Sequence, residues 1–181
     1  MGHQDWELCD CIASVQGEVG SHLEKFSAIT TERRCFISPG KPYLRSFQRL
    51  QSLELPLDIV IGDLKAAELA GHGSLDSGSL LVDLIPISVS ELSLFSPGKA
   101  PYDKALGLLF HDFAAQKQLQ KLNLKEICLT CPSDADDLYK AQCMNLEVET
   151  EKAGVDLVLM ETPTPISTVS IDDDVCYPDY E

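Results

Sequence analysis

The sequence predicts an α/β (α+β) domain with a mixed central sheet flanked by helices. Apolar runs alternate along the chain with stripes of helical periodicity, as expected when strands and helices pack in layers. The stretch Glu91–Glu161 carries this order most clearly, as strand, turn, long helix, strand, capped helix and strand. With 181 residues, 44% of them hydrophobic, the chain has room for a single domain with a real core.

The expected organisation has three parts. Residues 1–30 form an amphipathic helix or arm, residues 31–165 form the α/β domain, and residues 166–181 form an acidic tail that is disordered or loosely attached. In the first part, apolar residues recur at spacings of three and four, so a helix there either docks on the domain or binds a partner. The repeated residues are Leu8, Ile12, Val15, Val19, Leu23 and Phe26.

Four apolar runs are the predicted strands of the sheet. They are Leu57–Ile61, Ser79–Ile85, Glu126–Thr130 and Val155–Met160. Two shorter extended pieces are expected at Glu32–Ile37 and Leu146–Val148.

Helical periodicity predicts a long helix from Tyr102 to about Lys121. Its apolar residues fall at i, i+3, i+4 and i+7 and so share one stripe. They are Leu106, Leu109, Phe110 and Phe113. A second helix is expected after the capping segment Ser133–Asp136, with Leu138 and Ala141 facing the core.

The words Ser38-Pro39-Gly40-Lys41 and Ser96-Pro97-Gly98-Lys99 are identical, and each precedes a helical stripe. An internal β-α-β-α-β duplication explains the identity, and so does convergence on a good strand-to-helix turn. The serines of both copies also match proline-directed phosphorylation motifs, and Ser170 precedes an acidic run that suits acid-directed kinases.

The charge balance narrows the choice of partners. There are 14 basic and 29 acidic residues, a net charge of −15, which repels the phosphate backbone of nucleic acids and favours a partner with a basic surface. Many acidic proteins are simply soluble, so this alternative stays open. No run approaches the roughly 20 apolar residues of a membrane span, and the start has no signal-peptide pattern. Seven scattered cysteines suit reduced thiols in the cytoplasm or nucleus.

No catalytic or metal-ligating constellation is apparent in the sequence, and no cofactor is expected. Cys128 and Cys131 form a C-x-x-C motif, but Cys128 falls within a predicted strand, where the two side chains would point to different faces. His111 and Asp112 are neighbours on the predicted long helix and should face apart.

The order of elements, with Leu138-Tyr139 in the capped helix, resembles the core of acetyl-CoA-dependent N-acetyltransferases. That resemblance implies Tyr139 as a general acid. The turn departs from the family, because Pro97 and Pro101 have no N–H to donate to a cofactor pyrophosphate. An acetyltransferase with a degenerate cofactor loop is therefore the alternative function.

The words Gly78–Pro86, Ile127–Leu129 and Leu138–Val148 are similar to ornithine decarboxylase antizyme, a non-catalytic relative of that fold. The resemblance covers about Gly78–Met160. It implies a regulatory protein that binds ornithine decarboxylase, prevents its dimerisation and delivers it to the proteasome. Where the family's long helix carries partner-contacting glutamates, this chain has Asp112, Ala115 and Gln116. A generic acidic adaptor is the third reading.

The expected partner contacts are polar residues on the two helices of the central stretch. They are Asp103, His111, Asp112, Gln116, Asp134, Asp136, Asp137 and Lys140.

Overall fold

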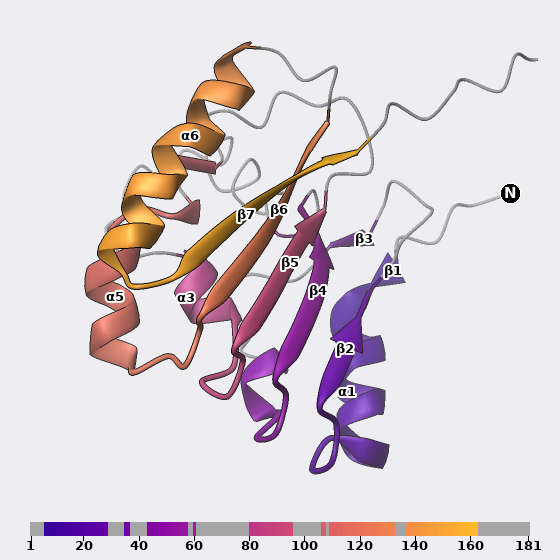
Figure 1. The fold of residues 1–181 in the computed structure, drawn as a ribbon. Coiled ribbons are helices and arrows are strands. Elements are labelled where there is room, and N and C mark those ends of the chain that lie inside the picture. The colour runs from indigo at the N-terminus through magenta and orange to yellow at the C-terminus, as the bar shows by residue number, and fades with distance from the viewer. Residues whose placement is uncertain are drawn as a thin grey trace, which may run out of the picture.

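The computed structural model describes residues 6–28, 35–36, 43–57, 60, 80–95, 106–107, 109–132 and 137–162. A sheet of five strands forms its centre, and the strands follow one another across the sheet in chain order (Figure 1). They are β2 (Lys25–Ser27), β4 (Ser52–Pro56), β5 (Glu91–Phe95), β6 (Glu126–Pro132) and β7 (Asp156–Thr162). A small second sheet pairs β1 (Trp6–Glu7) with β3 (Cys35–Phe36).

All four pairings in the central sheet are parallel. The α/β class is confirmed, whereas the expectation of a mixed sheet is wrong for these strands. Consecutive parallel strands need a crossover, and helical residues occur in the crossovers between β4 and β7. Because crossovers are right-handed and the order never reverses, each one returns over the same face of the sheet.

The helices accordingly gather on one side of the sheet, behind it and at its left in Figure 1. They are α1 (Leu8–Val19), the 3₁₀ helix η1 (Tyr43–Ser46), α3 (Leu80–Leu84), α5 (Phe113–Gln120) and α6 (Asp137–Lys152). The single hydrophobic core lies between these helices and the sheet, and it includes Ile12 of α1 and Phe113 of α5. Residues Lys25–Ser27, from the part of the chain that was expected to form a helix or arm, are instead a strand of the central sheet, paired with β4.

Arg45 joins three pieces of the helical layer. Its guanidinium donates hydrogen bonds from η1 to the carbonyl oxygen of Val82 at 3.0 Å and to Asp83 Oδ1 at 3.1 Å. The same group reaches Gln120 of α5, whose amide in turn donates to Asp83 Oδ1 at 3.0 Å. This polar cluster fixes η1, α3 and α5 relative to one another.

A short apolar pattern recurs at three neighbouring strands. Each copy of the pattern begins with a buried residue in the loop before the strand, and buried residues of the strand follow three and five positions later. The three copies are Leu50-x-x-Leu53-x-Leu55, Val89-x-x-Leu92-x-Leu94 and Leu124-x-x-Ile127-x-Leu129. The register places equivalent residues side by side, with Leu53 opposite Leu92 and Leu92 opposite Ile127.

The backbone repeats the same pattern where the strands begin. One carbonyl oxygen before each strand accepts hydrogen bonds from two consecutive N–H groups of the next strand's start, at 2.8–3.1 Å. The acceptors are Glu24, Gln51 and Ser90, and the donor pairs are Gln51 with Ser52, Ser90 with Glu91, and Lys125 with Glu126. Side-chain and backbone repetition together show that β4, β5 and β6 begin in the same way and that the described helices between them lie on one side of the sheet.

Two of the four predicted strands are wrong. Leu57 and Val60, from the expected strand Leu57–Ile61, are helical, and the strand lies just before them at Ser52–Pro56. The expected strand Ser79–Ile85 is the helix α3 instead. Short apolar runs fit either structure by periodicity, and here the buried residues Leu81 and Ile85 are four apart, as in a helix.

The predicted strands Glu126–Thr130 and Val155–Met160 are confirmed as β6 and β7, within two residues at each end. The expected strand Glu32–Ile37 contains β3, and its other residues lie outside the described part. The predicted extended piece Leu146–Val148 is wrong, since it lies inside α6.

The buried side of α6 also differs from the expectation. Leu138 is 66% exposed and Ala141 is exposed as well, so neither faces the core. The buried residues fall at i, i+4, i+7 and i+11 instead, a helical stripe one residue out of phase with the predicted one. They are Tyr139, Cys143, Leu146 and Thr150.

The predicted helix Tyr102–Lys121 is interrupted. Residues 106–107 and 109 are helical, a turn follows at Phe110–Asp112, and α5 begins at Phe113. Asp112 has φ 50°, in the left-handed region that a continuous helix excludes. All four residues of the predicted stripe are nevertheless buried, so the periodicity found the core although the helix breaks.

Candidate functional site

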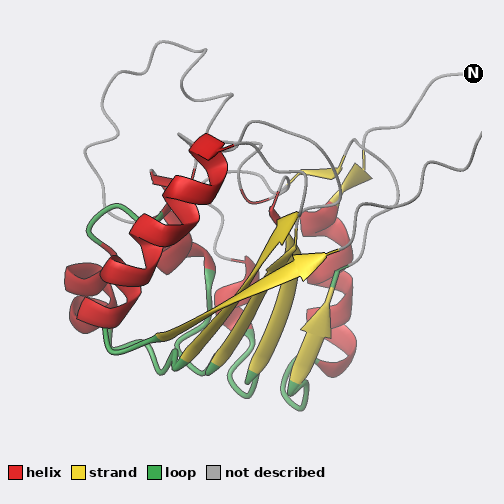
Figure 2. Ribbon diagram, turned by 45° about the horizontal axis from the view of Figure 1, so that its top comes forward, coloured by secondary structure: helices red, strands yellow, loops and turns green. Residues whose placement is uncertain are grey.

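The face of the sheet turned away from the helices is the candidate site. Side chains alternate along each strand, so the residues between the buried leucines point to this second face. We call it the open face, and no described helix packs on it (Figures 1 and 2). Its half-buried and exposed members are Lys25, Ser27, Ser52, Glu54, Glu91, Ser93, Glu126, Cys128, Asp156 and Val158, while Pro56 and Thr130 on the same face are buried.

Three carboxylates lie side by side across the open face. Glu91 is in register with Glu126, and Glu126 is in register with Asp156, on three successive strands. Neighbouring strands are about 4.8 Å apart, and like charges directly opposite one another destabilise a sheet. We call these residues the carboxylate row. Three adjacent carboxylates suit contact with a positively charged group, which would offset this repulsion.

Cys128 lies beside the carboxylate row. Its thiol donates a hydrogen bond to Glu126 Oε1 at 3.5 Å, a weak bond by length. Partial burial raises the pKa of the thiol, and both the hydrogen bond to Glu126 and the negative charge of that residue raise it further. The thiol is therefore kept protonated, unlike the activated thiolate of a redox C-x-x-C motif.

Glu54 is held by a neighbour on the same face. The hydroxyl of Ser27 donates to Glu54 Oε2 at 2.6 Å across the β2–β4 pairing, where these two residues are in register.

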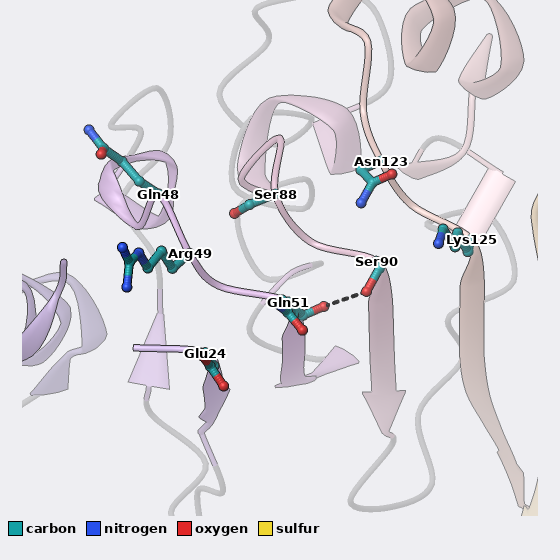
Figure 3. Close-up of a pocket in the computed structure, with 8 residues that line it drawn as sticks. All are labelled: Glu24, Gln48, Arg49, Gln51, Ser88, Ser90, Asn123 and Lys125. Carbon is teal, nitrogen blue, oxygen red and sulfur yellow. Dashed lines mark hydrogen bonds between the residues drawn. The ribbon is translucent and has the colours of Figure 1, made fainter. Parts of the chain in front are cut away.

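A separate depression of about 620 Å³ lies at the ends where the strands begin (Figure 3). It is lined by Glu24, Gln48, Arg49, Gln51, Ser88, Ser90, Asn123 and Lys125. These side chains spread along the rim without converging on one point, and Ser90 Oγ is engaged with the carbonyl oxygen of Gln51 at 3.3 Å. Ligands of open α/β sheets bind at the carboxyl ends of the strands, which is the opposite end. We therefore assign this depression no chemistry.

Among the described residues, no group of three or more His, Cys, Asp or Glu side chains is placed to hold a metal ion. Nor does any buried side-chain nitrogen or oxygen in that part of the chain lack a hydrogen-bond partner. None of the described helices is long and apolar enough to cross a membrane.

Tyr139, the general acid implied by the acetyltransferase resemblance, is 4% exposed. Its hydroxyl donates a hydrogen bond to the carbonyl oxygen of Thr130 at 3.1 Å, from α6 to β6. A general acid has to reach a substrate atom, and this hydroxyl instead ties a helix to a strand inside the core.

The predicted partner contacts that the structure describes lie on α5, on α6 and in the turn before α5, away from the open face. Asp137 and Lys140 are exposed on α6, and Gln116 is half-buried on α5. His111 Nδ1 and Asp112 Oδ2 are 3.4 Å apart, contrary to the expectation that they face apart, because residues 110–112 form a turn. Both are about two-thirds exposed, so solvent screens the pair.

Several predicted features fall outside the described residues. They are Asp103, Asp134, Asp136, the phosphorylation candidates Ser38, Ser96 and Ser170, and both Ser-Pro-Gly-Lys turns with Pro97 and Pro101.

Sequence reasoning missed the carboxylate row, although a signal for it was present. In two copies of the Leu-x-x-Leu-x-Leu pattern, the residue just before the second apolar position is a glutamate, Glu91 or Glu126. Aligning the copies would have placed these two residues on one face of adjacent strands. In a comparison with known proteins, no protein-family model, no curated protein and no solved structure matches this chain.

Proposed function

We propose that this chain is a non-catalytic regulatory protein that binds a protein partner through its open face. The observation that carries the proposal is the asymmetry of the sheet. One face is filled by buried leucines under the helices, whereas the other shows mainly half-buried and exposed side chains with no described helix on them. Pro56 and Thr130, toward the ends of β4 and β6, are the buried residues of this second face, so its exposed part lies nearer the strand starts. One-sided stacks of repeated units use such extended surfaces for binding.

The chemistry of the open face indicates the kind of partner. The carboxylate row supplies three adjacent negative charges, and the whole chain has a net charge of −15. Val158 follows Asp156 by two residues on the same face of β7, opposite Cys128. Its side chain is 41% exposed and offers an apolar contact beside the carboxylates. A protein surface with lysine or arginine side chains around an apolar patch fits this arrangement.

Ornithine decarboxylase is the named candidate for that partner, with delivery to the proteasome as the consequence of binding. Its support is the similarity of Gly78–Met160 to antizymes, together with the acidic charge. The acetyltransferase-like form of the domain belongs to the same resemblance. It is not needed for the binding proposal, because the open face follows from the parallel strand order alone.

A charge-reversal experiment tests the open face. The double variant Glu91→Lys/Glu126→Lys changes the carboxylate row, and Glu147→Lys/Glu151→Lys makes the same charge change on exposed positions of α6. The tagged wild-type chain and both variants are used to capture proteins from cytosol, followed by quantitative mass spectrometry. We expect at least one protein to be lost with the first variant and retained with the second. If no captured protein separates the two variants, the open face is not the binding surface.

The named partner is tested with purified ornithine decarboxylase, by following its activity and its mass as this chain is added. Inhibition with a shift from dimer to a complex with this chain supports it. A fully active dimer in excess of the chain excludes this enzyme and leaves the binding proposal standing with another partner.

The acetyltransferase alternative predicts that the chain binds acetyl-CoA. We expect calorimetric titration to show no binding, because Pro97 and Pro101 in the expected cofactor turn have no N–H to donate to the pyrophosphate. Micromolar affinity would contradict this expectation and restore the enzyme reading.

A further inference from the structure

The last strand of the central sheet, β7, has an outer edge that forms a second candidate surface. β7 ends the strand order, and no described strand pairs with its free side. It has seven residues, as many as its inner neighbour β6. A long strand with one unpaired edge presents a row of backbone N–H and C=O groups that is ready to pair with another strand.

Proteins usually protect such an edge with proline, charged side chains or a bulge, and β7 has only two charged residues, Asp156 and Glu161, toward its ends. Its central residues Leu157–Met160 are all apolar, and it contains neither proline nor lysine. Val158, Leu159 and Met160 are 41%, 39% and 42% exposed. The opposite edge of the sheet is different, because β2 has only three residues and carries Lys25. The asymmetry singles out β7 as an edge suited to pairing.

We propose that β7 pairs with β7 of a second copy of this chain, antiparallel, across a two-fold axis at Leu159. The two five-stranded sheets then form one continuous sheet, and the two-fold symmetry pairs the β7 edge of one copy with the β7 edge of the other. This inference concerns the backbone edge of β7 and does not depend on the proposed function, although Val158 belongs to both the edge strand and the open face.

In this register, the residues of β7 are compatible with the residues that they face in the second copy. Antiparallel pairing about Leu159 sets Val158 opposite Met160 of the second copy, and Leu159 opposite its own counterpart. The acidic residues meet uncharged ones, since Asp156 faces Thr162 and Glu161 faces Leu157. No like charges are opposed, so the pairing avoids the main penalty for cross-strand neighbours.

The two faces of the joined sheet are also consistent. Residues 158 and 160 belong to the open-face side of β7, whereas Leu159 is in register with the buried Leu129 on the helix side. Val158 and Met160 therefore cover each other on one side, and two half-exposed Leu159 side chains meet on the other. A second copy supplies this complementarity at both ends of the strand at once, which a peptide of arbitrary sequence does not.

Charge pairs at two positions test the register. The variant Val158→Lys/Met160→Lys places lysine opposite lysine at both cross-strand pairs, and we expect dimerisation to weaken by about tenfold or more. The matched variant Val158→Lys/Met160→Glu places lysine opposite glutamate at the same pairs, and we expect it to stay dimeric. Sedimentation equilibrium over a wide concentration range gives the association constants of both variants and of the wild type.

Three outcomes would overturn the proposal: a wild-type chain that is monomeric at every concentration, equal loss of dimer in both variants, or equal retention in both. Thermal unfolding of the monomeric fractions shows that the two variants are folded alike. Capture of a partner by the open face is measured separately with the Glu91→Lys/Glu126→Lys variant. Failure of dimerisation and failure of partner binding are thus told apart.

Discussion

The hydroxyl of Tyr139 is the only part of that side chain whose removal leaves the packing of the ring intact. In Tyr139→Phe, the carbonyl oxygen of Thr130 loses a buried donor at 3.1 Å. We expect the free energy of unfolding to fall by about 0.5–1.5 kcal/mol, the usual net value of such a bond. Denaturant unfolding monitored by circular dichroism measures it.

Leu138→Ala on the same helix is the control, because Leu138 is 66% exposed and its truncation should change stability by less than about 0.5 kcal/mol. A larger loss for Leu138→Ala than for Tyr139→Phe would mean that α6 packs through the face first predicted from the sequence.

The alkylation rate of the Cys128 thiol depends on the groups around its sulfur atom. Because burial and Glu126 raise its pKa, less thiolate is present at neutral pH, and alkylation should be slower than for an ordinary exposed thiol. The rate should rise with pH through an inflection above the usual value. Glu126→Gln removes the negative charge, lowers the pKa and should speed alkylation at neutral pH. Fragment-ion mass spectrometry separates Cys128 from the other six cysteines, including Cys131 three residues away.

Glu54→Gln is the matched control for Cys128, since Glu54 lies on the same open face but bonds to Ser27. We expect it to leave the alkylation rate unchanged. Equal acceleration by both substitutions would show that the net charge of the face, rather than contact with Glu126, sets the reactivity of the thiol.

At the scale of elements, α5 ends on a left-handed residue, Lys121, with φ 56°. Glycine adopts this conformation without the penalty that a β-carbon brings, so Lys121→Gly should raise the free energy of unfolding by up to about 1 kcal/mol. The same substitution inside the helix, Gln118→Gly, should lower it by about 1 kcal/mol, because Gln118 is exposed and only helix propensity is lost. Urea denaturation compares them, and equal signs would contradict the cap assignment.

The elements also show how far sequence patterns reach. β6 and β7 were predictable because their β-branched and apolar runs are bounded by turn residues on both sides. Leu80–Leu84 was not, because five apolar and acidic residues fit a strand and a helix equally well, and burial against α5 decides between them. The turn before α5 was missed for a different reason: Asp112 breaks the helix through its backbone, while the apolar stripe continues unchanged.

For the architecture of the whole molecule, the repeated Leu-x-x-Leu-x-Leu pattern was more informative than the two identical Ser-Pro-Gly-Lys segments. The Ser-Pro-Gly-Lys words lie outside the described residues, so the duplication that they suggest stays a prediction. The Leu-x-x-Leu-x-Leu pattern, by contrast, coincides with three strands, their register and their shared backbone hydrogen bonds. The open face could have been predicted from it, because strands in chain order with crossovers of one hand leave the other face free. The exposure of β7 could not, since its apolar residues Val158, Leu159 and Met160 match a buried strand in the sequence, and only the structure shows them 39–42% exposed.

The net charge of −15 should strengthen binding of a basic partner and weaken pairing of two copies through β7. Binding of a basic partner to the carboxylate row is attractive, so added salt should slow its association and weaken the complex. Pairing of two copies through β7 brings like charges together, so the same salt should reduce repulsion and strengthen the dimer. Above about 0.15 M salt, where the screening length is about 8 Å, both trends should flatten. Association rates from surface plasmon resonance and dimer constants from sedimentation, measured on one salt series, test both. Parallel trends would contradict the opposite effects of charge that we assign to the two associations.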